Sequence, residues 1–215
     1  MIKIISFDLD GTLMKTRFAD LVWLEGLPKI YAKEKNIVVE QAKQYLQQEY
    51  DKMGDDKPEW YDLSYWFNYF NLSYDSNELL NEYKHNIETY PEVPLVLKSL
   101  STQYDLIIIS NARKEFIEIE LEETCLKKYF THVFSSTSDF KKVKKTTNFY
   151  SMICKKLQIK PHEMMHVGDH KYFDYYIPRN IGIIAFFLNR ENVDTGEFIV
   201  HNLTEFTEKI NKFLE

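Results

Sequence analysis

Five short stretches of the chain are almost continuously apolar and predict the strands of one sheet. They are residues 2–7, 106–109, 132–134, 164–167 and 183–188. Apolar runs of this length are typical of parallel strands that are buried on both faces. Helical patterns lie between them and after the last one, over residues 93–101, 115–128, 147–157, 172–180 and 204–214. This alternation predicts an α/β fold with a doubly wound parallel sheet.

The segment between the first two predicted strands has a different pattern. It contains no convincing strand and predicts helices over residues 40–53, 60–70 and 76–87. We therefore expect an α/β core domain formed by residues 1–13 and 91–215, with residues 14–90 inserted as an all-helical cap subdomain. Both ends of the insertion return to neighbouring strands, so it can cover their carboxyl ends as a lid. Most of its aromatic residues are expected in the core of this subdomain, with one or two facing the cleft.

Composition narrows the classes of function. With 215 residues and 44% hydrophobic residues, the chain is long enough to bury a proper core. A formal net charge of −6 argues against nucleic acid as a partner, because such binding needs a basic face. The apolar run 181–188 is too short to span a membrane, and two cysteines without a Cys-x-x-Cys pair suit a reducing compartment. We expect a soluble cytoplasmic protein, monomeric or homodimeric.

Polar residues follow several predicted strands directly. Asp8 and Asp10 come after the first strand, Ser110-Asn111 after the second, and Gly168-Asp169 with Asp174 after the fourth. The ends of parallel strands are where open α/β sheets build their sites. Two ionised carboxylates this close repel each other, which favours a bound cation or a shared proton. The alternatives are an ordinary turn for the first group and a helix cap for Ser110-Asn111.

A basic cluster, Lys141-Lys142-Val143-Lys144-Lys145, precedes the predicted helix 147–157. With it, the chain resembles the haloacid dehalogenase-like hydrolase superfamily across essentially its whole length, with four motifs in the family order. Asp8-x-Asp10-Gly11-Thr12 is similar to the first motif, Ser110-Asn111 to the second, Lys144 to the third and Gly168-Asp169 with Asp174 to the fourth. The resemblance implies a Rossmann-like three-layer core and a helical cap similar to that of phosphoglycolate phosphatases.

The lysine motif departs from the family pattern. The family lysine is usually followed by proline, whereas Lys145 stands in that place here. Counting back from Val167-Gly168-Asp169 through the helix without a gap selects Lys144. Lys145 is the second choice, and Lys141 and Lys142 are less favoured.

The resemblance also implies roles for individual residues. Asp8 is expected as the nucleophile and Asp10 as the general acid and base. Ser110 and Lys144 are expected to hold phosphoryl oxygens, with Asn111, Gly11 and Thr12 as further substrate contacts. Mg²⁺ would be bound by the Asp8 side chain, the Asp10 backbone carbonyl and Asp169, with Asp174 as a ligand or just behind one.

The function implied is a magnesium-dependent phosphatase of a small phosphorylated metabolite, which acts through an aspartyl-phosphate. Asp10 argues against dehalogenation, because no alkoxide leaving group then needs a proton. A phosphomutase stays open, although Asp20 and Leu21 stand where such enzymes usually carry a histidine. A phosphonate hydrolase would need a cap lysine, for example Lys29, Lys33 or Lys35. A binding protein that retains the fold is the non-enzymatic alternative.

Overall fold

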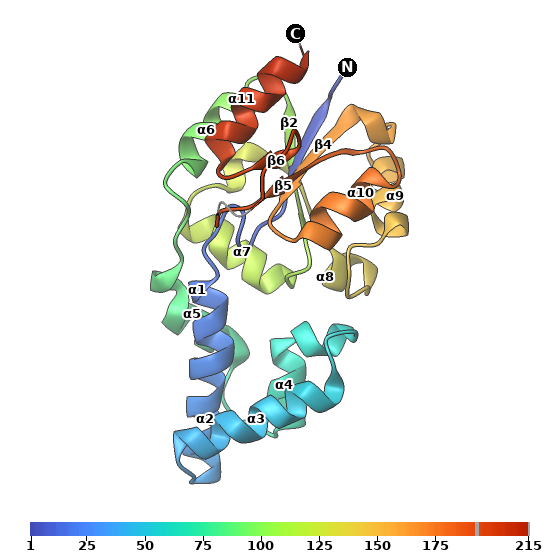
Figure 1. Ribbon diagram of the computed structural model, residues 1–215. Helices are drawn as coiled ribbons and strands as arrows, with labels where there is room; N and C mark the ends of the chain where they lie inside the picture. Colours follow the sequence, from blue (N-terminus) through green and yellow to red (C-terminus); the bar gives the residue numbers. More distant parts are fainter. Residues whose placement is uncertain (192–193, 215) are drawn as a thin grey trace.

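A six-stranded parallel sheet forms the centre of the molecule, with the strand order β3-β2-β1-β4-β5-β6. The computed structural model describes residues 1–191 and 194–214 (Figure 1). The strands are β1 (Ile4–Phe7), β2 (Asp105–Ser110), β3 (Phe130–Ser135), β4 (Met164–Gly168), β5 (Ile184–Leu188) and β6 (Ile199–Val200). The predicted α/β fold is confirmed. The short strand β6 was not predicted.

Helices cover both faces of the sheet, as the continuous apolar strands require (Figure 1). One face packs against α6 (Val93–Leu100), α7 (Lys114–Glu123) and α11 (Leu203–Leu214). The other packs against α9 (Thr147–Lys156) and α10 (Ile177–Arg179), and the short α8 (Ser136–Phe140) follows β3. Alternate residues of a strand serve the two faces, so that Ile5 lies in one apolar cluster and Ile4 in the other.

Between β1 and β2 the described chain forms helices that extend away from the sheet (Figure 1). They are α1 (Arg17–Leu21), α2 (Leu27–Lys35), α3 (Val39–Met53), α4 (Leu63–Tyr69) and α5 (Ser76–Tyr83). A π-helical turn (Val22–Gly26) joins α1 to α2, and a 3-10 turn (Pro58–Tyr61) precedes α4. A separate apolar cluster that includes Leu46, Trp66 and Phe70 holds them together. We call residues 14–90 the helical segment; its status as a separate subdomain stays a prediction.

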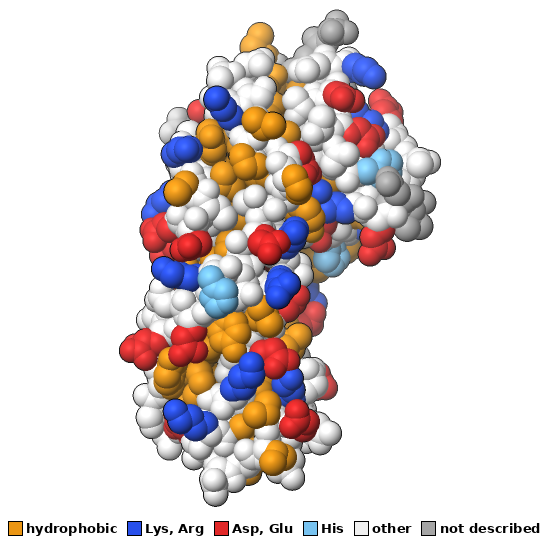
Figure 2. Space-filling view, turned by 90° about the vertical axis from the view of Figure 1, so that its left-hand side faces the viewer, with side chains coloured by type: hydrophobic (Ala, Val, Ile, Leu, Met, Phe, Trp, Pro, Cys, Tyr) orange, Lys and Arg blue, Asp and Glu red, His pale blue; other side chains and the backbone are white. Residues whose placement is uncertain are grey.

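The two ends of the helical segment meet beside the carboxyl end of β1. Met14 forms an isolated bridge with Thr89, and the Lys15 backbone N–H donates to the carbonyl of Glu88 (2.9 Å). On the face drawn in Figure 2, basic and acidic side chains are interspersed rather than gathered by sign. None of the helices within the described part of the chain is both long and apolar enough to cross a membrane.

Candidate active site

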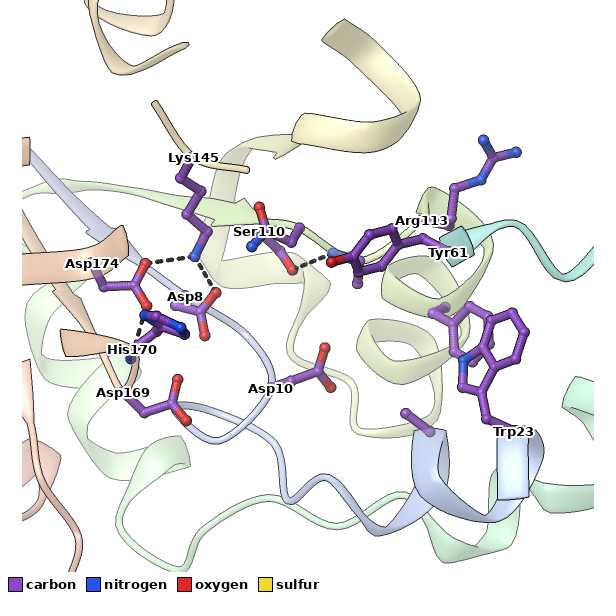
Figure 3. A pocket seen from close by; sticks show the side chains of 14 residues that line it. Asp8, Asp10, Trp23, Tyr61, Ser110, Arg113, Lys145, Asp169, His170 and Asp174 are labelled. Atoms are coloured by element: carbon purple, nitrogen blue, oxygen red, sulfur yellow. Dashed lines mark hydrogen bonds and ion pairs between the residues drawn. The ribbon is translucent and has the colours of Figure 1, made fainter. Parts of the chain in front are cut away.

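A pocket of about 260 Å³ opens at the carboxyl ends of β1, β2 and β4, against the helical segment (Figure 3). The sheet side contributes every predicted carboxylate together with Ser110 and Asn111, and the helical segment contributes aromatic and small side chains. Its lining consists of Asp8, Asp10, Ala19, Trp23, Tyr61, Ser110, Asn111, Ala112, Arg113, Phe116, Lys145, Asp169, His170 and Asp174. The strand ends therefore converge on one site, as the order of the sheet requires.

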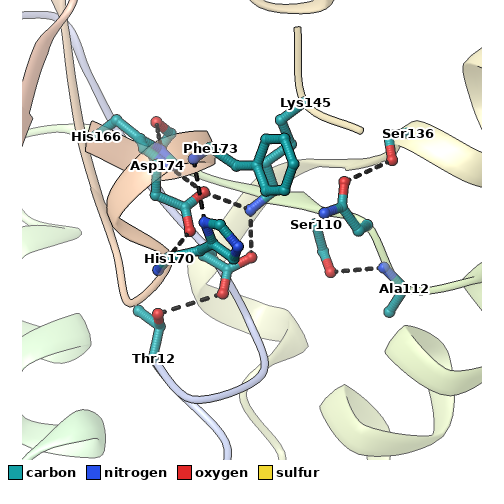
Figure 4. Close-up of polar contacts among 12 residues, drawn as sticks. Thr12, Ser110, Ala112, Ser136, Lys145, His166, His170, Phe173 and Asp174 are labelled. Carbon is teal, nitrogen blue, oxygen red and sulfur yellow. Dashed lines mark hydrogen bonds and ion pairs between the residues drawn. The ribbon is translucent and has the colours of Figure 1, made fainter. Parts of the chain in front are cut away.

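Asp8 lies at the back of this pocket and is almost fully buried. One of its carboxylate oxygens, Oδ1, accepts a hydrogen bond from Lys145 Nζ, and the other, Oδ2, accepts one from Thr12 Oγ1 at 3.3 Å (Figure 4). Burial raises the pKa of Asp8, and the positive charge of Lys145 opposes that rise. The lysine thus favours the ionised carboxylate that nucleophilic attack needs.

Lys145, the second choice from the sequence, lines the pocket, and Lys144, the first choice, does not. Lys145 is buried and bridges Asp8 and Asp174, with 2.6 Å from its Nζ to Asp174 Oδ1. Lys144 instead contacts Asp55 of the helical segment, at 3.3 Å. Counting back without a gap from Val167-Gly168-Asp169 therefore selects the residue next to the lysine that lines the pocket. The neighbouring carboxylates raise the pKa of Lys145 above its ordinary value despite its burial, so it stays charged.

Asp10 lies near Asp8 on the side of the helical segment (Figure 3). Its Oδ1 atom is buried, and no backbone group or hydroxyl of the described residues donates to it. The neighbour with which the Asp10 carboxyl interacts on this side is the carboxyl of Glu120. Burial first, and the charge of Asp8 second, raise the pKa of Asp10 to about 7. A carboxyl with a pKa in this range can both donate and accept a proton near neutral pH, as a general acid and base must.

Glu120 is a residue of this site that the sequence analysis did not single out. It lies on α7, is almost fully buried, and its carboxyl contacts that of Asp10. Burial first, and then Asp10, raise the pKa of Glu120 well above its ordinary value. The signal was available, because Glu120 stands on the apolar face of a helix, in register with Phe116 and Ile117.

The carboxylates on the other side of Asp8 form a cluster. Oxygen atoms of Asp8, Asp169 and Asp174 all lie within 4.8 Å of one another. Asp169 as a whole residue is exposed, but its carboxyl group faces Asp8 and Asp174. The loss of water around this carboxyl, and then the two negative charges, raise its pKa to about 8. Gly11 (φ 75°) makes room for this cluster, since a Cβ there would lie 2.1 Å from Asp169 Oδ2.

Both carboxylate oxygens of Asp174 have polar partners. Its Oδ1 accepts from Lys145 and lies 3.2 Å from His166 Nε2, and its Oδ2 accepts the His170 backbone N–H at 3.1 Å (Figure 4). Burial opposes its ionisation, but Lys145 and His166 outweigh it and hold the pKa of Asp174 below its ordinary value. With both oxygens engaged, Asp174 fits a place behind the ligands better than Asp8 and Asp169 do.

Hard carboxylate oxygens are the donors that Mg²⁺ prefers, so the cluster fits this ion. Asp8 keeps one oxygen that only Thr12 contacts, and among the described residues the Asp169 side chain forms no hydrogen bond or ion pair with another residue. After burial, the negative charges of Asp8 and Asp174 also raise the pKa of Asp169, and a bound cation would offset these charges. The predicted metal contact of Asp10 through its backbone carbonyl stays a prediction.

The remaining predicted residues fall into two groups. Ser110 and Asn111 line the pocket; Ser110 Oγ accepts the Ala112 N–H at 3.0 Å, and Asn111 Oδ1 accepts from Ser136 Oγ at 2.9 Å (Figure 4). Gly11 and Thr12, predicted as substrate contacts, do not line it. Arg190 binds their backbone carbonyls, at 3.1 and 2.7 Å. Lys29, Lys33 and Lys35, named for the phosphonate hydrolase alternative, do not line it either.

A family model, a curated protein and a solved structure are all similar to this chain along nearly its whole length. A family model described as haloacid dehalogenase-like hydrolase matches residues 5–187. A glyceraldehyde 3-phosphate phosphatase of Pyrococcus furiosus is 26% identical, over 98% of this chain and 94% of that protein. The crystal structure of a HAD phosphatase from Thermococcus onnurineus has a TM-score of 0.83 at 26% identity, with 97% of this chain and 98% of that chain covered.

An L-2-haloacid dehalogenase of Xanthobacter autotrophicus shares the fold, with a TM-score of 0.63 at 17% identity over 99% of both chains. The fold is thus common to proteins named for different reactions, and the family assignment rests on the match along the chain and on its four motifs. The chain belongs to the haloacid dehalogenase-like hydrolase family.

Proposed function

We propose that this hydrolase is a magnesium-dependent phosphatase that cleaves small phosphomonoesters through an aspartyl-phosphate. The observation that carries the proposal is the pairing of two different carboxyls in one pocket. Asp8 contacts Lys145, which favours its ionised form, whereas the pKa of Asp10 is raised to about 7. One is suited to attack and the other to proton transfer. The phosphatase names of the Pyrococcus and Thermococcus relatives support the same reading.

In the first step a carboxylate oxygen of Asp8 forms a bond to phosphorus while the bond from phosphorus to the ester oxygen breaks. Asp10 gives its proton to that leaving oxygen, which departs as an alcohol. In the second step Asp10 takes a proton from water as the water attacks phosphorus, and Asp8 is released with inorganic phosphate. Ser110, Asn111 and Lys145 line the pocket, and in this proposal they hold the phosphoryl oxygens.

Asp8 and Asp169 would hold Mg²⁺, with Asp174 behind them. When bound, the ion supplies positive charge that lets an anionic nucleophile approach an anionic phosphate. Lys145 contributes a fixed charge on the opposite side of Asp8.

Dehalogenation is the competing reaction within this family. It releases a halide, which needs no proton, so the role of Asp10 as a proton donor in the first step would be unused. The test is phosphate release from a panel of phosphomonoesters, with Mg²⁺ and with a chelator, beside halide release from 2-chloropropionate. We expect magnesium-dependent phosphate release and no halide. Halide release without phosphate release would overturn the proposal.

A further inference from the structure

The pocket has two chemically distinct ends. Asp8, Lys145 and Asp169 lie at one end, and Trp23 and Tyr61 lie at the other, beyond Asp10 (Figure 3). Trp23 stacks on Phe116 with 5.9 Å between ring centroids and 7° between ring planes. The Tyr61 hydroxyl donates to the backbone carbonyl of Asp55, at 3.3 Å. If phosphate binds beside Asp8, the leaving group meets this aromatic end.

The aromatic end offers no free positive charge among the described residues. Besides Lys145, the one Lys or Arg side chain of the lining is Arg113, and carboxylates already neutralise it. Its guanidinium contacts Asp62 at 3.0 Å and Glu115 at 3.1 Å, and it points away from Asp8 and Asp10 (Figure 3). The only other basic group of the lining, His170, lies on the side of Asp169 and Asp174.

From this distribution we infer that the pocket selects phosphomonoesters whose leaving group is uncharged, and discriminates against those that carry a second anionic group. This inference rests on the proposed phosphatase function. A carboxylate or a second phosphate on the leaving group would lose water against Trp23 and Phe116 without gaining a cation. It would also lie near the carboxyl of Asp10. An aldehyde, a hydroxyl or an apolar group meets neither cost.

Two three-carbon compounds test this directly. Glyceraldehyde 3-phosphate and 3-phosphoglycerate share a skeleton and differ in an aldehyde or a carboxylate at the end remote from the phosphate. We expect kcat/KM for phosphate release with Mg²⁺ to be at least about tenfold higher for the aldehyde. An equal or higher value for 3-phosphoglycerate overturns the inference while leaving a phosphatase. No release from these compounds or from p-nitrophenyl phosphate contradicts the proposed function itself, and the inference with it.

A variant that places a positive charge at the aromatic end tests the same inference, and an uncharged variant of similar length is its control. Ala19 lines the pocket and is half-buried, so Ala19→Lys brings a cation there, while Ala19→Met adds similar length without charge. We expect the preference for the aldehyde to be several-fold smaller in Ala19→Lys than in Ala19→Met. Tyr61→Lys and Tyr61→Met form a second pair at the other wall, in case the Ala19 variants unfold. Equal preferences within a folded pair would overturn the inference.

Discussion

Lys145 joins two buried carboxylates, Asp8 and Asp174, so its removal leaves negative charge without a partner. Breaking a buried ion pair by removing one member costs about 3–5 kcal/mol. We predict that Lys145→Met lowers the free energy of unfolding by an amount in this range, measured by urea unfolding. Phosphate release should fall by about a hundredfold or more, because a charge that holds the phosphoryl group is lost.

Lys144→Met is the control one residue away. Its ion pair with Asp55 is exposed to solvent, and pairs of this kind contribute about 1 kcal/mol or less. The variant should fold and turn over substrate nearly as the native chain does. A large loss in Lys144→Met with a mild effect in Lys145→Met would return the phosphate-binding role to Lys144.

Glu120 makes the stability of the chain depend on pH. Burial keeps its proton in the folded state, whereas the unfolded chain releases that proton near the ordinary pKa. Above that pKa the unfolded chain binds fewer protons than the folded chain, so the free energy of unfolding falls as pH rises toward the raised folded pKa. Glu120→Gln cannot ionise and should lose less stability between pH 5 and pH 8, measured by urea unfolding with a chelator present.

Glu118→Gln is the matched control, because Glu118 lies on the same helix and is exposed. Its stability should change with pH as that of the native chain does. If Glu120→Gln shows the same pH dependence as Glu118→Gln, Glu120 does not carry a retained proton.

Some residues of the site could be located from the sequence alone, and others could not. Asp8, Ser110 and Asp169 follow strands directly, and parallel strand ends converge, so position in the chain determined their place. The choice between Lys144 and Lys145 depended on the path of the loop after α8, which adjacent identical side chains cannot reveal. Glu120 lies beside Asp10 only because α7 packs beneath the pocket, a tertiary contact outside any motif.

At the scale of elements, the turn after β1 is held in a backbone conformation that suits glycine. Gly11 has φ 75°, and a Cβ would also collide with Asp169. We predict that Gly11→Ala costs about 1–3 kcal/mol of unfolding free energy. Because Asp169 must move, magnesium-dependent phosphate release should be lost as well. Urea unfolding and phosphate release measure the two effects.

Gly54→Ala is the control that separates the effect of backbone strain from the effect of displacing Asp169. Gly54 has φ 80°, and its Cβ would meet only Asp56 Oδ1, at 3.0 Å. This variant should lose stability by a similar amount and keep its activity. Activity lost equally in both variants would indicate that strain alone, and not the displacement of Asp169, accounts for the loss in Gly11→Ala.

The elements of the sheet were predictable because buried parallel strands need continuous apolar runs, and β2, β4 and β5 carry them. The two-residue strand β6 is too short to give such a signal. The π-helical turn Val22–Gly26 was not predicted. The helix predicted over residues 172–180 is instead a π-helical turn, Lys171–Tyr176, followed by α10. The predicted helix over residues 60–70 instead divides into a 3-10 turn and α4 at Asp62, whose side chain caps α4.

At the scale of the molecule, three ion pairs among the described residues join the helical segment to the core. Lys84–Glu123 lies away from the pocket lining, and two others involve residues at or next to it. Asp62 contacts Arg113, and Asp55 contacts Lys144. We predict that the double variant Asp55→Asn/Asp62→Asn raises KM modestly with little change in kcat, because each pair contributes only about 1 kcal/mol or less. Asparagine at position 62 still serves as the helix cap. Hydrogen exchange of residues 54–62 should be faster in the variant.

Asp56→Asn tests whether this effect is specific. Asp56 neighbours Asp55 and has no ion pair among the described residues. Exchange and KM should match those of the native chain. Equal changes in Asp56→Asn and in the double variant would mean that the two ion pairs do not hold the segment.

The proposed mechanism requires that Asp8 becomes phosphorylated during turnover. The most direct measurement is an acid quench of the native chain during hydrolysis of p-nitrophenyl phosphate with Mg²⁺, followed by peptide mass analysis, with Asp8→Asn in parallel. We predict a phosphate on the peptide that contains Asp8, and neither phosphorylation nor turnover in Asp8→Asn. Native turnover by a folded Asp8→Asn chain would contradict the account.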